Sequence, residues 1–219
     1  MKFLAEPRSG SYQGITSSRN RYGQYVRSRA TPVQPRTPYQ TAVRTRQATS
    51  AAAWRSLTAL QREAWAALGA LMVRTDPLGQ SYTLTGLQAF ASVNNNLAAA
   101  GDSRITDAPA LEEPATMLTV TPTITAAAFT VAYTPTPLDA SERALVCAGP
   151  PRSAGRGFEG DYRLIVVTAA AAASPANIFS AWSARFGAPT VGSRVFVSIQ
   201  RYIAGFVSAP LNTSALVTA

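Results

Sequence analysis

The sequence predicts an α+β chain of several domains: a basic, extended N-terminal arm with a hairpin, a small three-helix unit and a C-terminal antiparallel β-sandwich. The first fifty residues carry nine bases and one acid, a net charge of +8, whereas the other 169 carry eleven bases and ten acids. Thr37, Thr58 and Thr85 each stand three residues before a glutamine, and apolar residues alternate with polar ones after residue 116. We place the arm at 1–36, the helical unit at 37–101, a linker at 102–115 and the sandwich at 116–219.

The arm contains two short runs that favour β-structure, 11–18 and 21–29, joined by Arg19-Asn20. This pattern predicts a hairpin. Two strands alone are marginally stable in water, so the hairpin requires a sheet or a partner surface to lie on.

The concentrated charge predicts that the arm is the interaction element, because the rest of the chain is close to neutral. Its arginines alternate with tyrosines, a combination that serves nucleic-acid binding and protein interfaces alike. No nucleic-acid motif accompanies the charge, so we expect a protein partner and keep nucleic acid as the alternative. The predicted partner-binding residues are Arg19, Arg21, Tyr22, Tyr25, Arg27, Arg29 and Arg36.

Three prolines spaced by three residues, Pro32, Pro35 and Pro38, follow the hairpin. This spacing favours an extended, polyproline-like strap over a compact turn.

Capping boxes predict three helix starts, because in this motif a threonine and the glutamine three residues later satisfy each other's backbone donors. They begin at Thr37, Thr58 and Thr85 and predict helices over 38–56, 59–73 and 86–100. We expect Trp54 and Trp65 to anchor a small core. The other predicted core positions of these helices are Tyr39, Val43, Leu57, Leu60, Ala64, Leu68, Leu71, Met72, Leu87, Phe90, Val93 and Leu97.

Residues 101–115 carry two prolines and four acids among few apolar residues, which indicates a boundary. Beyond it we predict strands at 117–121, 126–134, 143–148, 162–168, 193–202 and 205–209, a number typical of a β-sandwich. A short helix is expected at 174–187, with Ser174 as its N-cap and Gly187 closing it.

The composition removes most familiar catalytic chemistry. Histidine is absent and Cys147 is the only cysteine, which excludes Cys/His zinc sites and imidazole-dependent triads. Gly155 to Gly160 matches G-x-G-x-x-G, but a strand follows it where a dinucleotide site needs a helix. The close acid pairs Glu112-Glu113 and Glu159 with Asp161 have no partner base and are interpreted as solvated acids. No cofactor, metal, membrane span or enzymatic activity is expected, and Cys147 is predicted to be a small buried residue.

The first hundred residues resemble uncharacterised proteins of tailed phages and prophages. The resemblance rests on Arg19-Asn-Arg-Tyr-Gly-Gln-Tyr-Val-Arg27, Pro35-Arg-Thr-Pro-Tyr-Gln40, Gln61-Arg-Glu-Ala-Trp65 and Leu84-Thr-Gly-Leu-Gln-Ala-Phe90. The later half is similar, by strand layout, to fibronectin type III or immunoglobulin-like modules.

The resemblance implies a virion structural protein assembled in the host cytoplasm, in particular a capsid cement or decoration protein. Its partners would be the major capsid protein or other virion proteins, and a homo-oligomer is also open. The alternative is a nucleic-acid-binding or tail/connector-associated virion protein. Capsid or tail location, copy number and the role of the sandwich stay open.

Overall fold

The computed structural model describes residues 9–20, 23–76 and 78–219. They belong to two compact units, 1–44 and 45–219, called here the N-terminal unit and the main unit. The prediction of a mixed α+β chain with antiparallel sheets is confirmed.

The N-terminal unit contains a three-stranded antiparallel sheet, and the predicted hairpin is confirmed as part of it. The strands are β1 (Gly10–Tyr12), β2 (Ile15–Asn20) and β3 (Gly23–Ser28), in the order β1-β2-β3. The first predicted run is interrupted at Gln13 and Gly14, which both take positive φ angles of 43° and 79°. Positive φ at both central residues is the geometry of a tight two-residue hairpin loop, so this run forms two strands instead of one.

All three predicted helices form, and their starts are confirmed by the capping contacts. They are α1 (Pro38–Ser56), α2 (Ala59–Leu71) and α3 (Gly86–Ala100). At Thr58 and Thr85 the threonine hydroxyl accepts from the glutamine N–H, and the glutamine side chain accepts from the threonine N–H. The same reciprocal pair links Thr37 and Gln40, with both distances 3.3 Å.

The aromatic core of the helices is only partly as predicted. Trp65 and Phe90 are fully buried and meet edge to face with centroids 5.2 Å apart. Trp54 is half-buried beside Phe90. The interpretation of six other positions as core is wrong, because their side chains are exposed: Tyr39, Val43, Leu60, Ala64, Leu71 and Leu87.

Two short strands, β4 (Val73–Thr75) and β5 (Ser81–Thr83), pair between α2 and α3 and were not predicted. Three-residue strands show too little alternation to be identified from the sequence.

The C-terminal half has more strands than predicted, and of the predicted strands β8 alone has the expected bounds. They are β6 (Thr119–Ile124), β7 (Phe129–Thr134), β8 (Arg143–Ala148), β9 (Arg163–Val167), β10 (Ala176–Asn177), β11 (Arg194–Ile203), β12 (Phe206–Val207) and β13 (Leu211–Leu216). Strands β10 and β13 were missed: the first has two residues and the second, Leu-Asn-Thr-Ser-Ala-Leu, is largely polar.

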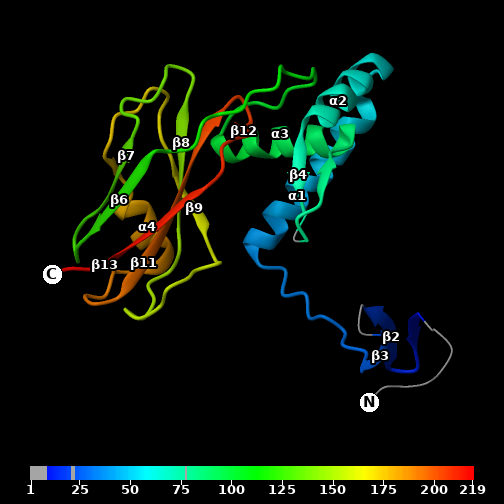
Figure 1. The fold of residues 1–219 in the computed structure, drawn as a ribbon, viewed down its shortest axis with the longest axis horizontal. Helices are drawn as coiled ribbons and strands as arrows, with labels where there is room; N and C mark the ends of the chain where they lie inside the picture. The colour runs from blue at the N-terminus through cyan, green and yellow to red at the C-terminus, as the bar shows by residue number, and fades with distance from the viewer. Residues whose placement is uncertain (1–8, 21–22, 77) are drawn as a thin grey trace. The chain divides into compact units, whose positions relative to one another are not determined.

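These strands form two antiparallel sheets that face each other across one apolar cluster (Figure 1). The first sheet has the order β10-β7-β6. In the second, β9-β8-β11 are consecutive, and β12 and β13 pair with the free edge of β11. The inner cluster takes Phe129 and Val131 from the first sheet, Val195 and Val197 from the second, and Trp182 from a covering helix.

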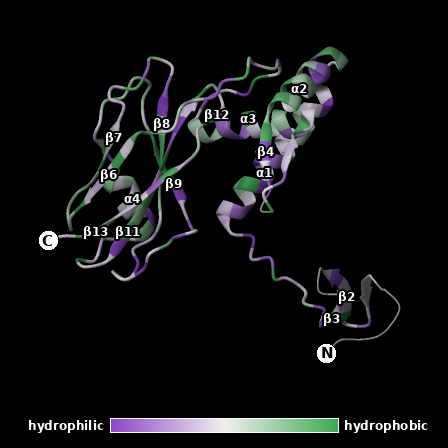
Figure 2. Cartoon of the chain, viewed as in Figure 1, coloured by the Kyte–Doolittle hydropathy of each residue, from purple (hydrophilic) through white to green (hydrophobic). Residues whose placement is uncertain are grey.

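The outer face of the second sheet is also apolar, and α2 and α3 cover part of it. Leu145, Tyr202 and Phe206 are buried in one cluster with Trp65 and Phe90. Strand β11 therefore serves two cores: Val197 and Ile199 point inward and Tyr202 points outward, as alternation along a strand requires. Figure 2 shows hydrophobic residues on the sandwich strands as well as on α2 and α3.

Residues 102–115, predicted as a linker, belong to the main unit and pack against its helix-containing cluster. Ile105, Ala108 and Leu111 lie against the helix-containing cluster, and the Trp65 indole donates to the carbonyl of Thr106 at 2.7 Å. The division into domains that fold independently stays a prediction.

The covering helix, α4 (Phe179–Phe186), starts later than predicted. Ala176 and Asn177 pair with β7 instead, and the Ser174 hydroxyl accepts from the backbone N–H of Tyr133 at 2.8 Å. Ser174 is therefore occupied by the sheet and is not the N-cap, whereas Gly187 ends the helix as expected.

Candidate interaction surface

The basic character of the N-terminal region continues beyond the predicted arm. From residue 7 to residue 62 the chain has ten arginines and no acidic residue. Among the described residues, the close ion pairs all join side chains of the segment 102–201, which lies after this stretch. The described carboxylates therefore do not neutralise this stretch, and its positive charge is available to a partner.

The three-stranded sheet presents two different faces, because side chains alternate along each strand. The register pairs Tyr12 with Ile15, Ser17 with Val26 and Arg19 with Gln24, which places Tyr12, Ile15, Arg19 and Val26 on one face. This is called the Arg19 face. Tyr12, Ile15 and Val26 are 73%, 46% and 40% exposed.

The opposite face, called the Arg27 face, is more polar. It carries Tyr25 and Arg27, paired with Ser18 and Thr16 on β2. The Thr16 hydroxyl lies 2.9 Å from that of Ser11 on β1. An aromatic ring and a guanidinium two residues apart thus share one exposed face.

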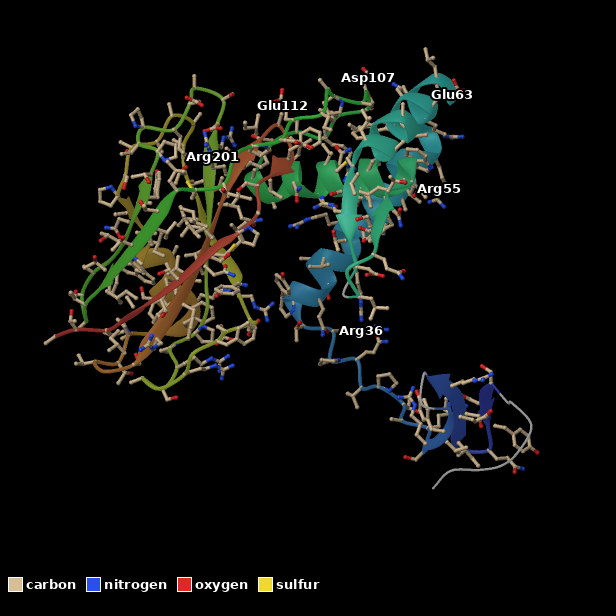
Figure 3. The ribbon with its side chains drawn as sticks, viewed as in Figure 1. Arg36, Arg55, Glu63, Asp107, Glu112 and Arg201 are labelled. Carbon is tan, nitrogen blue, oxygen red and sulfur yellow. The ribbon has the colours of Figure 1, made fainter. Side chains whose placement is uncertain are left out.

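The structure does not gather the seven predicted partner-binding residues into one patch. Arg19 lies on one face of the sheet and Tyr25 with Arg27 on the other, whereas Arg29 follows β3 and donates its backbone N–H to the Gly14 carbonyl at 2.7 Å. Arg36 lies in the strap before α1 (Figure 3). Arg21 and Tyr22 lie outside the described residues.

The strap, residues 29–37, has no helix or strand, as predicted, but it is not a regular polyproline helix. Arg36 has a φ of 50°, which breaks the extended run. The side-chain amide oxygen of Gln34 accepts from the Arg44 guanidinium at 2.6 Å and so links the strap to α1. Val33 remains 89% exposed.

The main unit contains one carboxylate whose environment differs from the expected one. Glu159 is buried and accepts from Arg152, from Gly160 N–H at 2.9 Å and from Asp161 N–H at 3.0 Å. The hydrogen bond from Arg152 is the main reason why the pKa of Glu159 falls to about 2. Its interpretation as a solvated acid is wrong, since the carboxylate fixes the loop between β8 and β9.

Other candidate chemical groups take structural positions. Burial raises the pKa of Cys147 to about 11, so its thiol is protonated near neutral pH. The glycine motif at 155–160 leads into β9, as expected from the sequence. Glu112 and Glu113 are exposed on the segment after α3.

Within the described ranges, no three acidic or cysteine side chains are grouped so that they could hold a metal ion. None of the described helices is both long and apolar enough to cross a membrane.

No protein-family model matches the sequence, and a comparison with curated proteins finds no match.

Proposed function

We propose that this chain is a non-enzymatic structural protein of a phage virion, a capsid cement or decoration protein that binds an acidic surface of a coat subunit through its N-terminal unit. The observation that carries the proposal is the Arg19 face, where exposed Tyr12, Ile15 and Val26 share one side of the sheet with an arginine. The virion assignment itself rests on the resemblance of the first hundred residues.

The energetics of the N-terminal unit favour a role in assembly. None of the described side chains of residues 9–44 is buried. A three-stranded sheet without a core does not offset its ordering entropy, so it requires a surface that buries one of its faces. Full burial of an Ile or Val side chain contributes roughly 1.5–3 kcal/mol, which makes the Arg19 face the natural face to cover.

The mixture on this face indicates a protein partner. Aromatic residues and arginine are enriched in protein interfaces and supply much of their binding energy. An acidic partner is favoured because residues 7–44 carry seven arginines and no acidic residue in the sequence. Aliphatic Ile15 and Val26 have no role on a phosphate backbone, whereas they fill pockets on a protein surface.

The strand order of the C-terminal half supports the proposed likeness to immunoglobulin or fibronectin type III modules. Apart from the two-residue strand β12, this half has seven strands, β6 to β11 and β13. Strands β6, β7 and β10, the first, second and fifth of the seven, form one sheet, and β8, β9, β11 and β13 form the other. Immunoglobulin-like sandwiches divide seven strands between two sheets in a closely related way, with the fourth strand on either side. We propose that this module is displayed outward on the particle. A shared fold by itself assigns no function.

A second candidate function, nucleic-acid binding, is favoured by the Arg27 face. Tyr25 can stack on a base while Arg27 contacts a phosphate, and both lie on the same exposed side of the sheet. In this alternative the protein would lie inside the head or at the tail or connector.

Binding of the purified protein to capsids assembled without it, and to random-sequence DNA, distinguishes the two. The proposal predicts saturable binding to capsids and weak binding to DNA. The alternative would be established by tight DNA binding and no capsid binding. The logarithm of the DNA-binding constant should then fall steeply with the logarithm of the salt concentration, because counterion release scales with the number of phosphates contacted.

A further inference from the structure

The outer face of the second sheet carries an open pocket of about 350 Å³ that no helix residue lines. Phe196 on β11 is buried at its floor and points outward, because its neighbours Val195 and Val197 belong to the inner cluster. Ser214 on β13 is paired with Phe196, and Asn212 stands on the same face two residues earlier. The sheet thus supplies an apolar floor and a polar wall.

The loop between β8 and β9 forms a second wall, and it is fixed to the sheet. Arg152 and Arg194 exchange two backbone hydrogen bonds of 2.8 Å, and the Arg194 guanidinium donates to the Ala154 carbonyl at 2.8 Å. Phe158 lies in this loop and is 75% exposed. Its ring rests on Gly160, where a Cβ atom would lie 3.6 Å from the Cε1 atom of the ring. An exposed aromatic ring is therefore held at the pocket by a loop that other contacts already order.

The polar groups of the pocket have hydrogen-bonding capacity that the described chain does not use. The Asn212 amide and the Tyr162 hydroxyl form no hydrogen bond with another described residue. The Ser214 hydroxyl accepts from Arg194 at 3.1 Å, which leaves its own proton for a ligand. Burial, and then the Glu159 carboxylate, raise the pKa of Tyr162, so its hydroxyl remains a donor near neutral pH.

The charge in this pocket is compensated. Glu159 is the single lining residue that is charged at neutral pH. Its carboxylate accepts a hydrogen bond from Arg152 and lies 3.7 Å from the guanidinium of Arg156. Because this charge is already paired, the pocket favours a neutral polar ligand over an ion.

We infer that this pocket binds a neutral sugar, whose ring stacks on Phe158. The sugar hydroxyls pair with the polar groups of Tyr162, Asn212 and Ser214. A sugar ring has an apolar face of C–H groups and hydroxyls around its edge, so it matches an exposed aromatic ring beside neutral donors and acceptors. A purely apolar ligand would leave these polar groups without partners, which costs binding free energy. This inference goes beyond the proposed function, because it uses the main unit alone and no residue of the N-terminal unit.

Saturation-transfer NMR of the full chain with methyl glycosides of glucose, galactose, mannose and N-acetylglucosamine tests the inference. Benzyl alcohol and acetate represent the competing classes, an aromatic ligand with few polar groups and an anion. The inference predicts that at least one glycoside receives saturation at millimolar concentration. Saturation of benzyl alcohol or acetate alone, with none of the glycosides affected, would overturn it.

Variants locate the binding. Phe158→Ala should weaken binding of that glycoside about two- to tenfold, as the loss of one aromatic contact implies, whereas Phe158→Tyr should retain it. Asn212→Leu keeps the size of the side chain and should also weaken binding. The matched control is Leu118→Ala, at a position that is 76% exposed and outside the pocket, and it should bind like the wild type.

A melting curve of each variant confirms that the main unit is folded, which is expected because Phe158 and Asn212 are exposed. Wild-type affinity of both Phe158→Ala and Asn212→Leu would overturn the inference, because the sugar would then bind elsewhere. Capsid binding through the sheet of the N-terminal unit is measured separately and does not enter this result.

Discussion

The hydroxyl of Tyr202 on β11 donates a hydrogen bond of 2.6 Å to Asp102, two residues after the end of α3. The other carboxylate oxygen of Asp102 accepts from Arg143 on β8 at 2.9 Å. Through these contacts the end of the helical region is fixed to two strands of the second sheet. Tyr202 is 2% exposed, so its ring also belongs to the shared apolar cluster.

Replacing Tyr202→Phe should therefore lower the free energy of unfolding by about 1–2 kcal/mol, because the variant loses a hydrogen bond to a charged group and keeps the ring. Urea unfolding of the full chain measures the change. Tyr82→Phe, at a position that is 48% exposed, serves as the matched control and should have no effect. Equal stability of the Tyr202 variant and the wild type would show that this link contributes nothing.

Gly205 forms the turn before β12 with a φ of +93°, and a Cβ atom there would lie 2.6 Å from the Cγ1 atom of Val93 on α3. Gly205→Ala should destabilise the protein by about 2–3 kcal/mol, since it combines backbone strain with a clash in a packed region. Gly155→Ala has open space and no positive φ, so it should change stability little. Melting curves of both variants test this, and similar melting temperatures would count against the close approach of α3 and the β11–β12 turn.

Glu159 should make the stability depend on pH in the acid range. Its pKa in the folded protein, about 2, lies below the ordinary value of 4.5, so its contribution is complete above about pH 4.5 and is lost as the pH falls toward 2. Glu159→Gln should lower stability at neutral pH and flatten this dependence. Exposed Glu113→Gln should keep the wild-type curve. The free energy of unfolding, measured at several pH values, tests this prediction. If the Glu159 variant keeps the wild-type dependence of stability on pH, Glu159 is not its source.

The C-terminal half, residues 116–219, should fold by itself with one cooperative transition. The buried members of its inner cluster all lie between Met117 and Val217, so this core is complete without α1, α2 and α3. The fragment should nevertheless be less stable than the full chain, because Leu145, Tyr202 and Phe206 lose their cover, at roughly 1.5–3 kcal/mol for each large apolar side chain. Calorimetry of the fragment measures this, and a broad transition without cooperativity would contradict independent folding.

Features encoded by a few neighbouring residues were predictable from the sequence. The three helix starts followed from Thr and Gln three residues apart, because a capping box is a local motif. Strand β8 was predicted at its observed bounds, Arg143–Ala148, since residues 144–148 are a short, continuous apolar run. The start of α4 failed because Ser174 and Pro175 favour a helix start locally, whereas tertiary pairing with β7 holds Ala176 and Asn177 in a strand.

Features that depend on contacts between distant segments were not predictable. Nothing near Leu145 or Tyr202 indicates that helices cover the outer face of the sheet, and the exposure of Leu60 and Leu71 depends on which helix face meets α3. For the candidate surface, the concentrated charge was recognised, but the separation of Arg19 from Arg27 was not. Arg19 on β2 pairs with Gln24, and Arg27 on β3 pairs with Thr16, so the register of the two strands puts the arginines on opposite faces. The alternation of residues within each strand does not define this register.

Attachment of face-specific variants to particles tests the central claim most directly. One variant alters the Arg19 face (Ile15→Ser, Arg19→Ser and Val26→Ser), another the Arg27 face (Tyr25→Ser and Arg27→Ser), and Arg55→Ser with Arg62→Ser on α1 and α2 removes charge outside the N-terminal unit. Co-sedimentation with particles that lack the wild-type copy gives the occupancy, and a melting curve confirms that each main unit is folded. The account predicts that the Arg19-face variant loses attachment while the Arg55/Arg62 variant keeps it. Wild-type occupancy of the Arg19-face variant would contradict the account, and loss confined to the Arg27-face variant would move the contact to the opposite side of the sheet.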